Sequence, residues 1–135
     1  MSILKIGGPL RRETNLNKLN NANSGDQVFL KGPRFDFINQ KHIFNNLTLS
    51  GKGINKTGIY IPEHSSGILF SGTVILSDLT INVPATSAGL IFDNATNVIL
   101  NNVRITYSGK FTRVSDHYSL LQTTSTPMSS FKLIN

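Results

Sequence analysis

Cysteine and tryptophan are both absent from this chain of 135 residues. The lack of cysteine excludes a disulfide scaffold, a zinc ribbon and thiol catalysis, and it leaves the redox compartment open. Charged residues are also scarce, at 15% of the chain, whereas helical bundles and coiled coils are rich in Glu, Lys, Ala and Leu. No apolar run approaches the roughly 20 residues of a membrane span. The composition therefore favours one β-rich domain with no membrane partner.

The N-terminus lacks the pattern of a secretory signal peptide, because the basic pair Arg11 and Arg12 follows the apolar residues and no long apolar stretch is present. We therefore expect synthesis in the cytoplasm, with association to a virion if the protein is related to phage.

Composition divides the chain into three parts. Residues 1–13 read as an irregular lead-in, and residues 111–135 as a covering segment rich in Ser and Thr. Between them, residues 14–24 have apolar residues at three-residue spacing and predict a short capping helix that ends at Gly25. From Asp26 to about Lys110 the chain shows short β-type runs separated by Gly, Asn, Pro and Ser.

These β-type runs repeat. The segments HIFNNLTL (42–49), VILSDLTI (74–81) and VILNNVRI (98–105) align, as do GILF (67–70) and GLIF (89–92). The spacing from Ile75 to Ile99 and the spacing from Gly67 to Gly89 both lie in the low twenties. The clearly longer spacing from Ile43 to Ile75 predicts an insertion around residues 50–58. Strands this short, recurring at this period, indicate a solenoid of stacked coils.

Polar residues occupy the same place in each repeat, at Asn46, Asp78 and Asn102. Asn and Asp tolerate the left-handed backbone of a tight bend. We expect these three side chains either to form a hydrogen-bonded ladder between coils or to be ordinary solvated turn residues.

The stretch from Leu16 to Gly53 resembles the opening coil of right-handed parallel β-helices of the pectate-lyase-like superfamily. The matching features are an apolar helix-like segment, Gly25-Asp26 before a short strand, and Leu47-Thr48-Leu49-Ser50-Gly51. Residues 97–105 look like a typical coil of the same superfamily. The resemblance covers about residues 14–110 and implies an all-β, single-stranded right-handed parallel β-helix of about four coils with an N-terminal capping helix. It implies little about activity, since pectate lyases, polygalacturonases and phage tailspikes share this fold.

The catalytic patterns of that superfamily are not visible. No adjacent Asp pair, Gly-His-Gly or calcium-binding carboxylate cluster occurs. We therefore expect a non-catalytic module with a structural or polysaccharide-binding role, related to phage or mobile elements, with no cofactor and no metal site. As an alternative we keep a minimal lyase or hydrolase of an acidic polysaccharide that uses Asp78, Asp93 and Arg104.

The net charge is +6, and five of the 13 basic residues fall within the first coil and its insertion. A basic face there would attract an anionic polysaccharide, although a solvated surface that keeps the strands soluble explains the same charges. The absence of alternating basic and aromatic residues argues against nucleic acid. The candidate binding residues are Lys31, Arg34, Lys41, Lys52 and Lys56.

Alternation along the repeats predicts that Ile43, Ile75 and Ile99 point outward and stack into an apolar stripe. We expect this stripe to be covered either by residues 111–135, through residues such as Phe111 and Phe131, or by a second subunit in a homo-oligomer.

Overall fold

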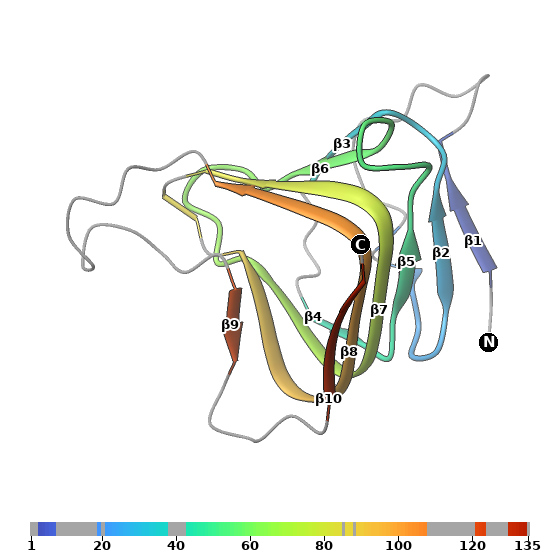
Figure 1. The fold of residues 1–135 in the computed structure, drawn as a ribbon, viewed down its shortest axis with the longest axis vertical. Helices are drawn as coiled ribbons and strands as arrows, with labels where there is room; N and C mark the ends of the chain where they lie inside the picture. The colour runs from blue at the N-terminus through green and yellow to red at the C-terminus, as the bar shows by residue number, and fades with distance from the viewer. Residues whose placement is uncertain are drawn as a thin grey trace.

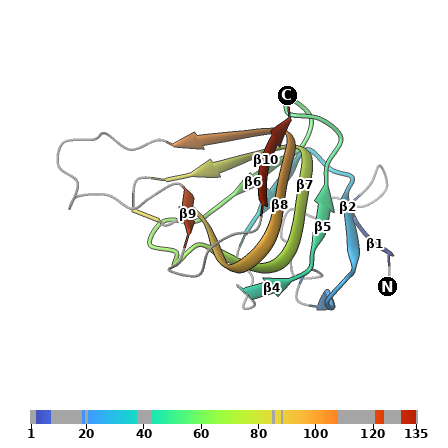
Figure 2. The same ribbon diagram turned by 60° about the horizontal axis from the view of Figure 1, so that its bottom comes forward.

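The computed structural model describes residues 3–7, 19, 21–37, 43–84, 86–87, 89–107, 121–123 and 130–134. The described residues form an all-β parallel solenoid of about three turns, so the expected four coils are not confirmed (Figures 1 and 2). Every strand pairing in the described residues is parallel. The strands are β1 (Ile3–Ile6), β2 (Gln27–Leu30), β3 (Arg34–Asp36), β4 (Ile43–Asn45), β5 (Thr48–Ser50), β6 (Gly58–Tyr60), β7 (Ile68–Val83), β8 (Leu90–Tyr107), β9 (Leu121–Thr123) and β10 (Ser130–Ile134).

The strands line three faces of the solenoid. The first face contains β4, the start of β7, the start of β8, and β9. The second face contains β1, β2, β5, the middle of β7 and β8, and β10. The third face contains β3, β6 and the ends of β7 and β8. Strands β7 and β8 each run through all three faces, and Figure 1 shows them bending along their length.

The core consists of columns of identical or similar apolar side chains. Phe37, Phe44, Phe70 and Phe92 follow one another with ring centroids 6.4, 6.3 and 5.7 Å apart. On the second face Val28, Leu49, Leu76 and Leu100 occupy matching positions and are all buried. Because one coil cannot bury its own apolar side, stacking of the coils provides the hydrophobic stabilisation.

The bends between faces require a left-handed backbone. Asn46, Asp78 and Asn102 have φ of 53°, 58° and 55°, the region that Asn and Asp tolerate better than other residues with a side chain. Asn102 Nδ2 donates to Asp78 Oδ1 at 3.0 Å, which confirms a ladder between these two corners.

Asn46 belongs to a different corner. Its Oδ1 accepts from the Thr73 backbone N–H at 2.8 Å, and its Nδ2 donates to Ser24 Oγ at 3.0 Å. The three-residue ladder is therefore wrong for Asn46, which lies beside Gly72 rather than Asp78.

The position of Asn46 beside Gly72 also shows that the first repeat aligns differently with β7 than the sequence analysis expected. Phe44 pairs with Phe70, and Leu49 pairs with Leu76, so residues 42–49 match a segment that begins near Gly67 rather than at Val74. The expected stripe of Ile43, Ile75 and Ile99 does not form, because Ile43 lies beside Leu69 while Ile75 pairs with Ile99. Stacking of Phe44 on Phe70 buries two large rings and explains why this register is the favourable one.

The expected insertion is confirmed. Leu49 pairs with Leu76, and Ile59 pairs with Ile81. The segment between Leu49 and Ile59 is twice as long in sequence as the segment between Leu76 and Ile81. The extra residues form the loop at 51–57 between β5 and β6.

The described residues do not confirm the irregular lead-in at residues 1–13 or the capping helix at residues 14–24. Residues 3–6 of the expected irregular lead-in form β1, which pairs with β2 and extends the second face. Most of the predicted capping helix, 14–18 and Asn20, lies outside the described residues, and the described residues contain no α-helix. The described residues thus contain no helix that is long and apolar enough to cross a membrane.

In the C-terminal segment, the described residues continue the solenoid. Strands β9 and β10 pair edge to edge with β8 on the first and second faces. Lys132 continues the row of Ile75 and Ile99 rather than lying over it. Phe111, which was expected to contribute to the cover, lies outside the described residues.

Candidate functional site

The third face presents two outward rows of polar residues. Because side chains alternate along a strand, Phe35, Ile59 and Ile81 point into the core and are buried, while the residues on either side of them point outward. In register, one outward row is Arg34, Gly58, Thr80 and Arg104, and the other is Asp36, Tyr60, Asn82 and Thr106.

The inserted loop 51–57 forms a wall beside these rows. Thr80 Oγ1 donates to the Ile54 carbonyl at 2.6 Å, and Arg104 Nη1 donates to Asn55 Oδ1 at 3.3 Å. The loop follows β5, contacts Thr80 on β7, and is bonded by the side chain of Arg104 on β8. These two bonds hold the loop over the outward face.

The base of the loop is anchored by Thr57, which is only 1% exposed. Its hydroxyl accepts from the Lys52 backbone N–H at 2.9 Å and donates to the Gly32 carbonyl at 3.1 Å. A Cβ at Gly51 would lie 2.6 Å from the Asp78 carbonyl oxygen, so only glycine lets the loop start there. The wall is thus a defined part of the fold.

An open groove of about 230 Å³ lies between the loop and the two rows. Among the described residues that line it, Lys56 and Arg104 are charged and none carries a carboxylate. The lining consists of Pro33, Ile54, Asn55, Lys56, Thr57, Gly58, Tyr60, Thr80, Asn82, Arg104 and Thr106.

Tyr60 lies between the groove and Arg34. The guanidinium carbon of Arg34 is 3.8 Å from the centre of the Tyr60 ring, a cation–π contact. Arg34 also donates from Nε and Nη2 to Asp36 Oδ1, at 3.3 and 3.2 Å. A Cβ at Gly58 would lie 3.1 Å from the Tyr60 ring, so glycine at this position gives the ring room to lie over the strand.

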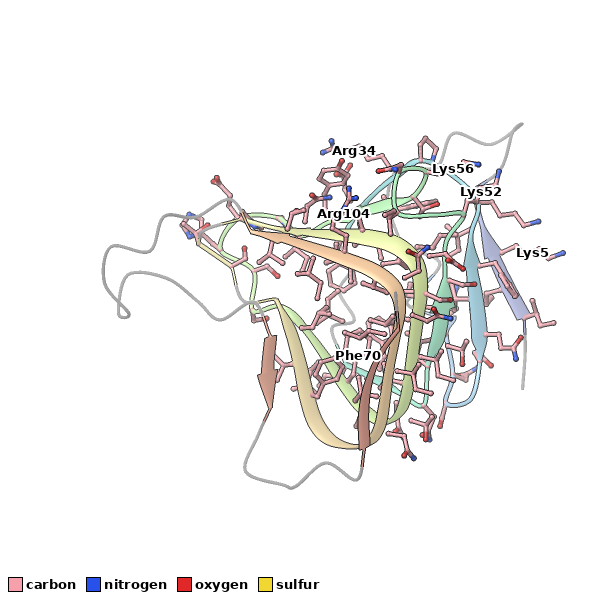
Figure 3. The ribbon with its side chains drawn as sticks, viewed as in Figure 1. Lys5, Arg34, Lys52, Lys56, Phe70 and Arg104 are labelled. Carbon is pink, nitrogen blue, oxygen red and sulfur yellow. The ribbon has the colours of Figure 1, made fainter. Side chains whose placement is uncertain are left out.

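Two of the candidate binding residues, Arg34 and Lys56, lie on the same side of the molecule as Arg104, which was selected for the enzyme alternative. Figure 3 shows Arg34, Lys56 and Arg104 on one side of the molecule, above β6, β7 and β8. Lys52 begins the same loop, and Lys31 is an exposed residue directly after β2. Lys41 lies outside the described residues.

The structure does not bring together the three residues of the enzyme alternative. Asp78 lies at the bend between the second and third faces, whereas the backbone of Asp93 follows Phe92 at the end of the first face. The segment Asn97–Asn101, which separates these bends, spans about 16 Å at about 3.3 Å per residue. Hydrolysis by two carboxylates requires them to be about 5–10 Å apart. Arg104 belongs to the groove instead.

The sequence analysis did not identify the uncharged residues of the groove, Tyr60, Asn82 and Thr106. The Thr106 hydroxyl donates a hydrogen bond to Asn82 Oδ1. The spacing from Tyr60 to Asn82 and the spacing from Asn82 to Thr106 both match the repeat period, and this signal could have located the row.

Within the described part of the chain, no three His, Asp or Glu side chains gather in a way that could hold a metal ion.

No family model matches the chain, and neither the curated proteins nor the solved structures contain a match to it.

Proposed function

We propose that this solenoid is a non-catalytic module that binds an anionic polysaccharide in the groove of the third face. The observation that carries the proposal is the described lining of that groove, in which Lys56 and Arg104 lie among hydroxyl and amide side chains and no described residue contributes a carboxylate. Cations attract acidic sugars, and neutral amides and hydroxyls can hydrogen-bond sugar hydroxyls.

The shape of the groove also favours binding to a polymer. It is open, and its volume of about 230 Å³ is below the about 300–1,000 Å³ typical of pockets that enclose a small molecule. A chain that passes through such a groove needs no closed pocket. Exposed charges contribute little singly and are screened by salt, so we expect binding through several weak contacts that weakens as salt rises.

We further propose that the solenoid is a right-handed member of the pectate-lyase-like superfamily. The resemblance of Gly25-Asp26 and of residues 47–51 and 97–105 supports this assignment, together with the parallel stacking of the coils. A minimal lyase or hydrolase remains the alternative that the experiment must separate from binding.

The test measures binding of the full chain to a panel of anionic and neutral polysaccharides by calorimetry, at low salt and at about 0.15 M salt. The variants Arg104→Gln and Lys56→Gln each remove one positive charge from the groove. Lys5→Gln is the matched control, because Lys5 is exposed on β1 and lies away from the groove (Figure 3).

We expect about two- to fivefold weaker binding for each groove variant, since an exposed ion pair contributes about 0.5–1 kcal/mol, and no measurable change for Lys5→Gln. Equal losses in all three variants, or no binding to any anionic polymer at low salt, would refute the groove proposal. Release of reducing or unsaturated ends from the polymer by the unaltered chain would establish the enzyme alternative.

A further inference from the structure

The two arginines of the third face have different partners. Arg34 forms an ion pair with Asp36, at 3.2 Å between Nη2 and Oδ1. Arg104 donates to the neutral amide oxygen of Asn55. Among the described residues no carboxylate forms an ion pair with Arg104 or with Lys56. Within the described residues, Asp36 therefore offsets the charge of Arg34, whereas no carboxylate is ion-paired with Arg104 on β8 or with Lys56 on the loop.

The two arginines are also separated in space. Arg34 lies on β3 and Arg104 on β8, with β6 and β7 between them. Three strand spacings of about 4.8 Å place their backbones about 14 Å apart. Tyr60 and Asn82 lie on the two strands in between and present an aromatic ring and an amide. A ligand that crosses the strands meets one charged end and one neutral end.

The neutral end can accept an uncharged sugar. Both hydrogen bonds from Arg34 go to Oδ1 of Asp36, so Oδ2 remains to accept from a sugar hydroxyl. The stacked guanidinium and Tyr60 ring form a flat surface next to it. A ligand carboxylate placed there would face the charge of Asp36, and like charges brought together at a binding interface are unfavourable.

We infer that this groove, if it binds an acidic glycan as proposed above, selects chains in which acidic and neutral sugars alternate over chains in which every sugar is acidic. Arg104 holds the acidic group of one sugar, and Lys56 adds a second positive charge to the same groove. Arg34, Asp36 and Tyr60 contact a neutral sugar further along the chain. The repulsive element that creates the selectivity is Asp36.

The test compares two oligosaccharides with equal numbers of carboxylates. One is an alternating glucuronate–N-acetylglucosamine oligomer, and the other is an oligogalacturonate, in which every sugar is acidic. Calorimetry with the full chain at about 0.15 M salt should give at least about tenfold tighter binding of the alternating oligomer. Non-specific attraction alone predicts the reverse order, because the oligogalacturonate carries its charges closer together.

Two variants change the charge beside Tyr60 in opposite directions, one by removing the negative charge of Asp36 and the other by removing the positive charge of Arg34. Asp36→Asn removes the repulsive charge and leaves Arg34 unpaired, so binding of the oligogalacturonate should tighten about tenfold while that of the alternating oligomer changes little. Arg34→Gln leaves Asp36 uncompensated, so binding of the oligogalacturonate should weaken further. Circular dichroism of both variants checks that they remain folded.

The outcomes separate this inference from the proposed function. If Arg104→Gln leaves binding unchanged, or if no anionic polymer of the panel binds at low salt, the proposed function fails. If a polymer of the panel binds but neither oligomer does, the proposed function stands and the selectivity is refuted. If both oligomers bind through Arg104 with equal affinity, or if Asp36→Asn leaves their ratio unchanged, the proposed function stands and the selectivity is refuted.

Discussion

Asn102 donates a hydrogen bond from Nδ2 to Oδ1 of Asp78, which lies one coil away and 24 residues earlier in the chain. Both residues have a left-handed backbone, with φ of 55° and 58°. The Asn and Asp side chains thus provide both the tolerance for the left-handed bend and the hydrogen bond that joins one coil to the next. Directly before each of them, Ser77 and Asn101 are paired between β7 and β8.

The bend at Asp78 therefore has two separable contributions to stability. Asp78→Ala places a Cβ-bearing residue without a polar side chain at positive φ, which costs about 1–2 kcal/mol, and it removes the bond from Asn102, worth about 1 kcal/mol. Asp78→Gly removes the bond but tolerates the backbone. Urea unfolding should show a loss of about 2–3 kcal/mol for Asp78→Ala and about half of that for Asp78→Gly. Equal losses would show that the left-handed backbone contributes nothing.

Gly72 should be far less replaceable than Gly25. Both have positive φ, 71° and 88°, so alanine is strained at both positions. A Cβ at Gly72 would lie 2.1 Å from Asn46 Oδ1, whereas a Cβ at Gly25 meets nothing within 4 Å. We expect Gly25→Ala to cost about 1 kcal/mol. Gly72→Ala should cost about 1–3 kcal/mol more, because Asn46 must move and lose its bond from Thr73.

Thermal and urea unfolding of the two glycine variants would test this difference. A loss of stability that is the same in both variants would mean that Asn46 adjusts without cost, and that its bond to Thr73 does not stabilise the corner.

The phenylalanine column should carry a large part of the stability. Phe70 is 1% exposed and lies between the rings of Phe44 and Phe92. Phe70→Ala should lower the free energy of unfolding by about 3–5 kcal/mol, a large fraction of the roughly 5–15 kcal/mol that is typical of a whole protein. Ile43→Ala is the control on the neighbouring strand, because Ile43 is 60% exposed and its truncation should change stability by less than about 0.5 kcal/mol. Similar losses in both variants would contradict the register that places Phe44 inward and Ile43 outward.

The loop 51–57 should depend on the hydroxyl of Thr57. Thr57→Val keeps the shape of the side chain but removes the bonds to the Lys52 N–H and the Gly32 carbonyl. Leaving buried polar groups without partners costs about 1–3 kcal/mol, and the loop that carries Asn55 and Lys56 should exchange its backbone amide protons faster. Hydrogen exchange measured by mass spectrometry reports this effect directly.

Thr48→Val is the matched control for the loop, since Thr48 is half-buried on β5 and no side-chain bond is recorded for it in the structure. Exchange at 52–56 that stays at the original rate in Thr57→Val would show that Thr57 does not hold the loop.

The sequence alone was sufficient to predict the parallel solenoid, the insertion and the polar bends. A period in the low twenties is readable wherever the coils have nearly equal length, and Asn and Asp mark a left-handed backbone by their chemistry. The same period contained the row of Tyr60, Asn82 and Thr106, although hydroxyl and amide residues do not stand out from a background rich in them.

Only the tertiary structure decided the register of the first repeat and the composition of the groove. An alternating apolar strand matches several partners equally well in sequence, so the stacking of Phe44 on Phe70 rather than on a residue near Leu76 depends on three-dimensional packing. The groove depends on the path of the inserted loop, which brings Asn55 to Arg104 across 49 residues of chain. No local pattern encodes that contact, because it arises from how far a short insertion can reach across a stack of coils whose spacing is set by backbone hydrogen bonds.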